Sequence, residues 1–140
     1  MSNFTFTPTD IPGVQIVDVK AYGDARGYFM ETYKAADFAA AGIQDTFVQD
    51  NQSGSCHGVL RSADNRRQLY IPRGFAHGFQ VLSEQAVFAY KCDDVYHPED
   101  EGGIRWDDTD IGIVWPGQDA PILSEKDQHW PALRALGIEL

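Results

Sequence analysis

An imidazole that follows a rigid turn is the first feature of this sequence that could do chemistry. Residues 68–71 alternate polar and apolar side chains, as a half-buried strand does. Pro72 and Gly74 then favour a turn, because proline fixes φ and glycine adopts backbone conformations closed to other residues. His77 comes next, ahead of an apolar run over 79–82, so we expect a hairpin that brings His77 to the edge of a sheet. A hairpin whose His only hydrogen-bonds a backbone carbonyl fits the same pattern.

Four further groups of polar side chains could bind or act on a ligand. Arg26 and Glu31 flank a turn and a strand, and are either functional or a surface ion pair. Residues 49–51, Gln-Asp-Asn, offer hydrogen-bonding groups, or form an ordinary strand end. Tyr90 lies between apolar neighbours, so its hydroxyl is either functional or simply at the rim of the core. Residues 124–127 begin with Ser and end with Asp, which is typical of a helix N-terminus.

A metal site is not expected. Cupin metal sites need a His-x-His pair, a Glu and a later His, and the segment from Pro72 to His77 is similar to the second half of that motif. The first half is absent, because His57 has no His two residues further on, and His97 and His129 lie in predicted loops. One His alone cannot hold a divalent metal.

Length and composition bound the class of protein. A chain of 140 residues with 43% hydrophobic residues fits one domain, 1–140, with a real core. No window is long and apolar enough to span a membrane, and the first residues lack the regions of a signal peptide. The two cysteines, Cys56 and Cys92, form no disulfide framework, so we expect a cytoplasmic protein.

The charge pattern limits the partners. A net charge of −10 argues against binding to a nucleic-acid polymer, which needs a basic face. A local arginine cluster could still hold a small anion, because a guanidinium grips phosphate or carboxylate with two hydrogen bonds. An ordinary surface of mixed charge explains the same pattern. The cluster consists of Arg61, Arg66, Arg67 and Arg73.

The apolar periodicity predicts an all-β fold, a β-sandwich or jelly roll, with one short helix. The helix is expected over 34–41, with Phe38 facing inward and Gly42 as its C-terminal cap. Residues 53–55 read as a flexible link, and 127–136 as a helical turn or two. Strands are expected at 14–19, 28–33, 46–51, 57–61, 68–71, 79–82, 86–91 and 113–116.

Motifs along nearly the whole chain resemble those of the dTDP-4-dehydrorhamnose 3,5-epimerase family, which are metal-free cupins. The most specific block runs from Arg66 through Gln68-Leu69-Tyr70-Ile71-Pro72 to His77-Gly78-Phe79. The other matching blocks, in chain order, are 11–14, 23–27, Glu31, 47–51, 58–61, 90–92, 96–99, 101–106 and 121–127.

This resemblance implies a cupin-like jelly roll and an isomerase without a cofactor. The implied reaction is epimerisation of a dTDP-4-keto-6-deoxy sugar at C3 and C5, in the biosynthesis of the nucleotide sugar dTDP-rhamnose. In the family a His removes a proton from one face of the sugar and a Tyr returns one to the other face. Carried over by position, Tyr90 is the acid and Asp127 the partner of the base. The residues implied to hold the sugar nucleotide are Arg26, Glu31, Gln49, Asn51, Arg61, His77, Glu101 and Lys126.

The chain departs from the family pattern after Arg61. In the family, Gly-Val-Leu-Arg is followed by Gly-Leu-His, and that His is the base. Here residues 62–65 follow instead, and they resemble the segment that normally lies much later in the chain. The sequence therefore predicts an internal deletion between Arg61 and Ser62 that removes the base and several core strands. The strand edges left by such a gap favour association, so we expect a homodimer with an incomplete jelly roll.

Three functions stay open from the sequence. The first is a family member with weak or no turnover, because the catalytic His is missing. The second is a non-catalytic sugar-nucleotide-binding or deletion form of the epimerase. The third, a distant alternative, is a metal-binding cupin.

Overall fold

The computed structural model describes residues 1–56, 66–116 and 121–137, and they form mainly antiparallel strands with one short α-helix. This agrees with the predicted all-β class. The chain divides into two compact units. The first unit contains Met1–Thr46 and Ala63–Phe75, and the second contains Phe47–Ser62 and Ala76–Leu140. No helix among the described residues is long and apolar enough to cross a membrane.

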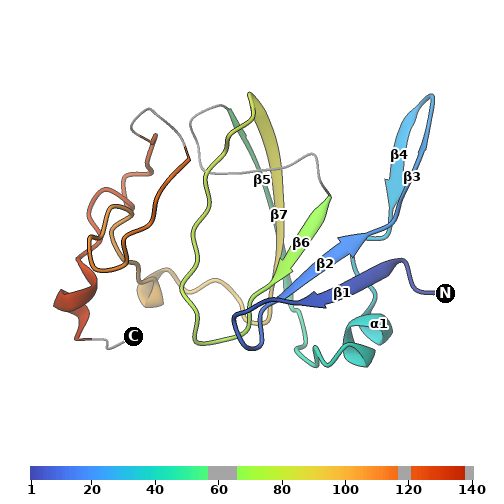
Figure 1. The fold of residues 1–140 in the computed structure, drawn as a ribbon, viewed down its shortest axis with the longest axis horizontal. Coiled ribbons are helices and arrows are strands. Elements are labelled where there is room, and N and C mark those ends of the chain that lie inside the picture. Colours follow the sequence, from blue (N-terminus) through green and yellow to red (C-terminus); the bar gives the residue numbers. More distant parts are fainter. Residues whose placement is uncertain (57–65, 117–120, 138–140) are drawn as a thin grey trace. The chain divides into compact units, whose positions relative to one another are not determined.

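A three-stranded antiparallel sheet organises the first unit (Figure 1). Its order is β1 (Phe4–Pro8), β2 (Gln15–Val19) and β6 (Arg67–Tyr70). The strands predicted near 14–19 and 68–71 are therefore confirmed. However, β6 pairs with β2, and residues 79–82 form no strand, so the predicted hairpin around Pro72 is wrong. The apolar run lies in the second unit, where the Phe79 ring is stacked on the Phe88 ring at a centroid distance of 4.5 Å.

The hairpin of β3 (Ala21–Asp24) and β4 (Gly27–Met30) extends from the rest of the first unit (Figure 1). β4 ends at Met30, three residues before the predicted end. Gly27 has a φ of 130°, a conformation that a side chain would disfavour, which explains glycine just after the turn. The Phe29 side chain of this hairpin is 71% exposed. The guanidinium of Arg66 lies 4.1 Å from the centre of the Tyr28 ring.

An aromatic core lies between helix α1 (Ala35–Ala40) and the strands of the first unit. Phe38 is buried, and its ring meets those of Phe4, Phe6 and Tyr33 edge to face at centroid distances of 5.3, 5.1 and 4.8 Å. Such pairs contribute about 0.5–1.5 kcal/mol each beyond area burial. Gly42, with a φ of 91°, follows the helix, so the predicted helix, its inward Phe38 and its terminal glycine are confirmed.

The second unit is built on two long antiparallel strands, β5 (Gln49–Cys56) and β7 (Gln85–Cys92) (Figure 1). The strand predicted at 86–91 is confirmed. Two other predictions are corrected: the polar residues 49–51 open β5 and do not end a strand, and 53–55 continue β5 in place of a flexible link. Cross-strand pairing with β7 outweighs the weak strand propensity of the Ser and Gly residues. The strand predicted at 57–61 lies outside the described residues.

Loops and two short 3₁₀ turns, Pro98–Asp100 and Leu133–Leu136, complete the second unit. The second turn is the helical element expected within 127–136. No strand forms at 113–116, where the Trp115 indole N–H donates to the carbonyl of Trp106 at 2.8 Å. This apolar run is tied to a loop by a side chain, and its Pro116 lacks the N–H that a strand ladder needs.

A buried carboxylate organises these loops. Asp108 is 5% exposed and accepts backbone N–H groups of Leu133 at 2.9 Å, Asp110 at 2.9 Å and Ile111 at 3.2 Å. The hydrogen bond from Leu133, followed by those from Ile111 and Asp110, lowers the pKa of Asp108 below its ordinary value. The acidic loop and the 3₁₀ turn at Leu133 are thus held by one side chain.

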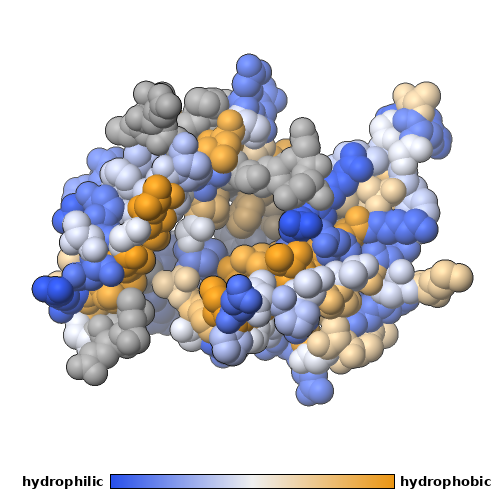
Figure 2. Space-filling view, viewed as in Figure 1, coloured by the Kyte–Doolittle hydropathy of each residue, from blue (hydrophilic) through white to orange (hydrophobic). Residues whose placement is uncertain are grey.

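Both units carry apolar groups on the surface, as the orange areas of Figure 2 illustrate. Among the described residues, Val87 on β7 is 70% exposed, and Val114 is 92% exposed. Large exposed apolar groups on a strand often mark a surface that a partner covers.

Candidate functional site

One face of the β5–β7 pair gathers three of the predicted site residues. The register pairs Asn51 with Tyr90 and Gln49 with Cys92. Residues directly opposite each other in an antiparallel pair point to the same face, and so do residues two apart on one strand. Gln49, Asn51 and Tyr90 therefore share a face. The two amides are half-buried and Tyr90 is 45% exposed, so all three side chains can be reached by a ligand.

The two amide groups of this face are oriented by a backbone group. The N–H of Tyr96 donates to Oε1 of Gln49 at 2.9 Å. Nε2 of Gln49 then donates to Oδ1 of Asn51 at 3.1 Å, and Nδ2 of Asn51 donates to Sγ of Cys92 at 3.7 Å. Because a backbone N–H can only donate, it fixes which end of the Gln49 amide is the acceptor, and that choice sets Asn51 in turn.

An aromatic row flanks the amides. The Phe88 ring lies 5.4 Å from the Tyr90 ring and is stacked at 4.5 Å on Phe79. Phe79 belongs to the segment that also carries His77, whose side chain is exposed. Tyr90 therefore has a ring packed along the row, while 45% of the residue is exposed.

A charged cluster adjoins the amide pair through Tyr96. Nζ of Lys126 donates to the hydroxyl of Tyr96 at 3.1 Å and to the carboxylate of Glu101. Hydrogen bonds from Lys126, and then from Tyr96, lower the pKa of Glu101. Those with Glu101, and then with Tyr96, raise the pKa of Lys126. Both groups therefore keep their charge across the neutral range.

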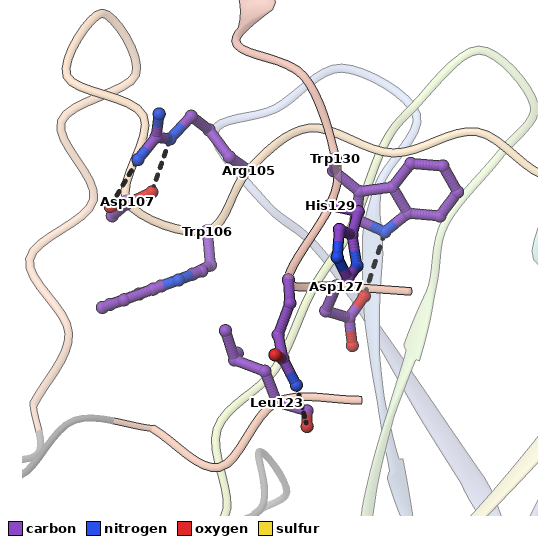
Figure 3. Close-up of a pocket in the computed structure, with 8 residues that line it drawn as sticks. Arg105, Trp106, Asp107, Leu123, Asp127, His129 and Trp130 are labelled. Atoms are coloured by element: carbon purple, nitrogen blue, oxygen red, sulfur yellow. Dashed lines mark hydrogen bonds and ion pairs between the residues drawn. The ribbon is translucent and has the colours of Figure 1, made fainter. Parts of the chain in front are cut away.

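Asp127 is held on both carboxylate oxygens. Oδ2 accepts from the hydroxyl of Ser124 at 2.7 Å. Oδ1 accepts from the indole Nε1 of Trp130 at 3.1 Å, as Figure 3 shows. The N–H of Asp127 returns a 3.2 Å hydrogen bond to Ser124, so the cap-like Ser-to-Asp pattern forms, although a turn follows it and not an α-helix. Asp127 also lies on the wall of a pocket of about 250 Å³, whose other lining residues are Arg105, Trp106, Asp107, Leu123, Gln128, His129 and Trp130.

The remaining predicted residues lie elsewhere. Arg26 and Glu31 belong to the first unit and do not pair with each other: Arg26 contacts Asp24 at 2.6 Å, and Glu31 accepts from Asn3 at 3.1 Å. The hydrogen bonds of the Arg26 side chain and then of its N–H lower the pKa of Asp24. Arg61 lies outside the described residues.

The arginine cluster forms individual contacts. Arg67 pairs with Asp18 at 2.7 Å, and Arg66 covers the Tyr28 ring. For Arg66 and Arg67 these are the contacts of a mixed-charge surface, and Arg61 lies outside the described residues.

Three exposed side chains bring metal-ligating atoms within 4.8 Å of one another, namely His97, Glu99 and Asp100. Exposed groups of this kind are common without an ion. The group is therefore not counted as part of the site.

Sequence reasoning gave no role to Tyr96, Ser124 or Trp130. Tyr96 lies in the block 96–99 that resembles the family, but no local pattern reveals that its backbone N–H donates to Gln49. Ser124 was visible as a cap-like residue, whereas the contact of Trp130 with Asp127 depends on the fold of the turn.

Amides, a tyrosine hydroxyl and a lysine–carboxylate pair lie around a two-stranded antiparallel ribbon, which makes the chain a β protein with a polar candidate site. The family model for dTDP-4-dehydrorhamnose 3,5-epimerase matches residues 8–63 and 62–135. The chain belongs to this family.

Individual relatives agree. The chain is 39% identical over 179 residues to dTDP-4-dehydrorhamnose 3,5-epimerase of Methanothermobacter thermautotrophicus, which covers 96% of this chain and 97% of the relative. It is 39% identical over 166 residues to the enzyme of Pseudomonas aeruginosa, covering 87% and 92%. Among solved structures, the 3,5-epimerase of Legionella pneumophila matches with a TM-score of 0.87 at 36% identity, covering 94% of this chain and 93% of that one. The fold is accordingly a cupin-like jelly roll.

The comparisons also bear on the predicted deletion. The match to the Methanothermobacter relative spans 179 residues, whereas this chain has 140, so at least 39 of those positions have no counterpart here. The family model matches in two segments that meet at 62–63, next to the predicted junction of Arg61 and Ser62. The first finding concerns only the length, and the second concerns the place, so the internal deletion stays a prediction.

Proposed function

We propose that this chain binds a dTDP-4-keto-6-deoxy sugar and acts as a slow 3,5-epimerase of dTDP-rhamnose biosynthesis in the cytoplasm, with no metal or cofactor. The observation that carries the proposal is the shared face of Gln49, Asn51 and Tyr90. Family membership supports the ligand class. The Legionella relative was solved with dTDP-4-keto-L-rhamnose, and the 29% identical relative from Bacillus anthracis with TDP and PPi. The two units are proposed to form one domain, since the family model spans both.

The proposed chemistry is proton exchange beside the 4-keto group. Water or buffer, in place of the family's base, takes the proton from the carbon, and the electron pair of the broken C–H bond moves onto the keto oxygen as an enolate. This pair then returns to the carbon and forms a new C–H bond with the hydroxyl proton of Tyr90 on the opposite face, and the tyrosinate left behind is reprotonated by water or buffer. The oriented amides and the Lys126–Glu101 pair hold the nucleotide sugar during this exchange.

Turnover is proposed to be slow because the family's base has no counterpart in this sequence. General base catalysis typically supplies about 10²–10⁴-fold, and imperfect placement of the substrate adds to the loss. Asp127, which orients that base in the family, has its two oxygens engaged by Ser124 and Trp130. The non-catalytic binding form remains the second candidate, because the same missing His favours it.

The test is deuterium wash-in at C3 and C5 when purified protein is incubated with the keto-sugar nucleotide in D₂O. We expect exchange several orders of magnitude slower than that of a complete relative measured in parallel, and abolished by Tyr90→Phe. Exchange within tenfold of the relative would contradict the missing base. If the protein binds dTDP but exchange is no faster than in buffer alone, the chain is the non-catalytic binding form and not a slow epimerase.

A further inference from the structure

Two segments of the second unit, residues 101–105 and 124–131, are joined at three successive points. Lys126 contacts Glu101, the Trp130 ring contacts Gly103, and the N–H of Arg105 donates to the carbonyl of Pro131 at 3.0 Å. The Trp130–Gly103 contact lies between the other two along both segments. Glu101 therefore lies two residues before Gly103, and Lys126 lies four residues before Trp130.

The contact at Gly103 leaves no room for a side chain. A Cβ added there would lie 2.6 Å from Cδ2, Cε2 and Nε1 of the Trp130 ring, closer than real Cβ atoms approach other atoms. The indole ring therefore rests directly on the backbone of Gly103. In contrast, a Cβ added at the neighbouring Gly102 would meet nothing within 4 Å. The two adjacent glycines thus differ in whether the ring of Trp130 covers them.

The same indole ring holds Asp127. Its Nε1 donates to Oδ1 at 3.1 Å, while Ser124 binds the other carboxylate oxygen (Figure 3). Because the ring is fixed on Gly103, the position of its N–H is fixed as well, and with it the rotamer of Asp127. Lys126, the residue before Asp127, is directed to Glu101 and Tyr96.

We propose that Trp130, seated on Gly103, is a positioning residue of the candidate site that sets Asp127 and keeps Lys126 beside Glu101. The part of this inference that concerns ligand affinity rests on the proposed function. The contact itself does not, because it is a property of the unliganded protein.

The affinity test uses the two adjacent glycines. Gly103→Ala displaces the ring and should weaken dTDP binding by about tenfold, the size of coupling typical of residues in contact. Gly102→Ala should leave the affinity within about twofold of wild type. In a Trp130→Ala background, which itself weakens binding, Gly103→Ala should have no further effect, since the clash is gone. Equal losses for the two glycine variants, or additive losses in the double variant, overturn the proposal.

A second measurement decides the contact without any ligand. The indole N–H signals of the three tryptophans are recorded by ¹⁵N NMR, and Trp130→Phe identifies the signal of Trp130. Asp127→Asn should shift that signal and leave the one from Trp115, which donates to a backbone carbonyl, in place. An unmoved Trp130 signal overturns the proposal. If wild type does not bind dTDP but the Trp130 signal shifts in Asp127→Asn, the proposed function is refuted and the contact between Trp130 and Asp127 stands.

Discussion

The amides of Gln49 and Asn51 are oriented before any ligand arrives. Tyr96 gives its N–H to Gln49, so the spare hydrogen-bonding capacity of the pair is one N–H on each amide nitrogen and one lone pair on each amide oxygen. A ligand that complements this arrangement does not have to pay for reorienting the amides, and preorganisation of this kind favours affinity.

The proposed nucleotide binding does not depend on the proposed rate of turnover. We expect dTDP to bind weakly, and Arg61→Ala to weaken it by about tenfold or more, because each charge-assisted hydrogen bond contributes about 1.5–3 kcal/mol. Asn51→Ala should also weaken binding, since it removes an amide of the candidate site and the acceptor of the Gln49 side chain. Calorimetric titration measures both effects.

The control for these variants is Arg105→Ala. Its guanidinium pairs with Asp107 at 2.6 Å on an exposed loop, so its loss should leave dTDP affinity within about twofold. If wild type does not bind dTDP at millimolar concentration, or if Arg61→Ala and Arg105→Ala behave alike, the nucleotide site has not survived the deletion.

Asp108 makes the stability of the second unit sensitive to acid. Its pKa is lowered in the folded state by the backbone N–H of Leu133 and then by those of Ile111 and Asp110. Its contribution to stability is therefore fully present above the unfolded pKa of about 3.9 and is lost as the pH falls through the folded pKa. We expect Asp108→Asn to have a lower Tm than wild type at pH 7. The difference in Tm between the two proteins should become smaller below about pH 4.

Thermal unfolding at several pH values checks this expectation. Asp10→Asn, at an exposed turn, serves as the control and should leave Tm unchanged at every pH. A gap between Asp108→Asn and wild type that stays constant down to pH 3 would show that the carboxylate charge is not what stabilises the loops.

At the scale of elements, α1 contributes mainly through one side chain. The helix is short, and an isolated helix of six residues is not stable in water, so its packing against β1 decides its stability. Phe38→Ala should reduce the free energy of unfolding by about 3–5 kcal/mol, because it empties a buried aromatic site. Phe29→Ala, at a 71% exposed position, should change it by no more than about 0.5 kcal/mol. Urea unfolding followed by circular dichroism compares the two, and similar losses would argue against a core centred on Phe38.

The elements that could be predicted from sequence are those specified locally. α1, β2 and β7 carry clear apolar periodicity, and the structure has them close to the expected bounds. The pairing of β6 with β2 could not be predicted, because it joins segments far apart in the chain. Residues 53–55 form a strand through their partner strand, against their own propensity.

The candidate site divides in the same way. The resemblance pointed to Gln49, Asn51 and Tyr90, and the strand register places them on one face. The contacts that orient them, such as the N–H of Tyr96 and the indole of Trp130, arise only from tertiary packing and leave no local pattern.

At the scale of the whole molecule, the described sheets are small and leave strand edges open. The first unit has a three-stranded and a two-stranded sheet, and the second has a two-stranded one, so every described strand except β2 has a partner on one side only. Unpaired edges carry free N–H and C=O groups that another chain can satisfy. The proposed deletion is a physical reason for this, since it removes strands that would otherwise continue the sheets.

We therefore expect a homodimer or larger species in solution, formed through the β5–β7 ribbon. Sedimentation at micromolar concentration should give at least twice the monomer mass, and a compact monomer would contradict this.

Val87 on β7, which is 70% exposed, allows a test of the interface with a matched control. Val87→Lys should shift the equilibrium toward monomer, because it places a charge where an apolar contact is lost. Val114→Lys, at a 92% exposed loop position of the same unit, should leave the mass unchanged. Dissociation by both variants, or by neither, would place the interface elsewhere.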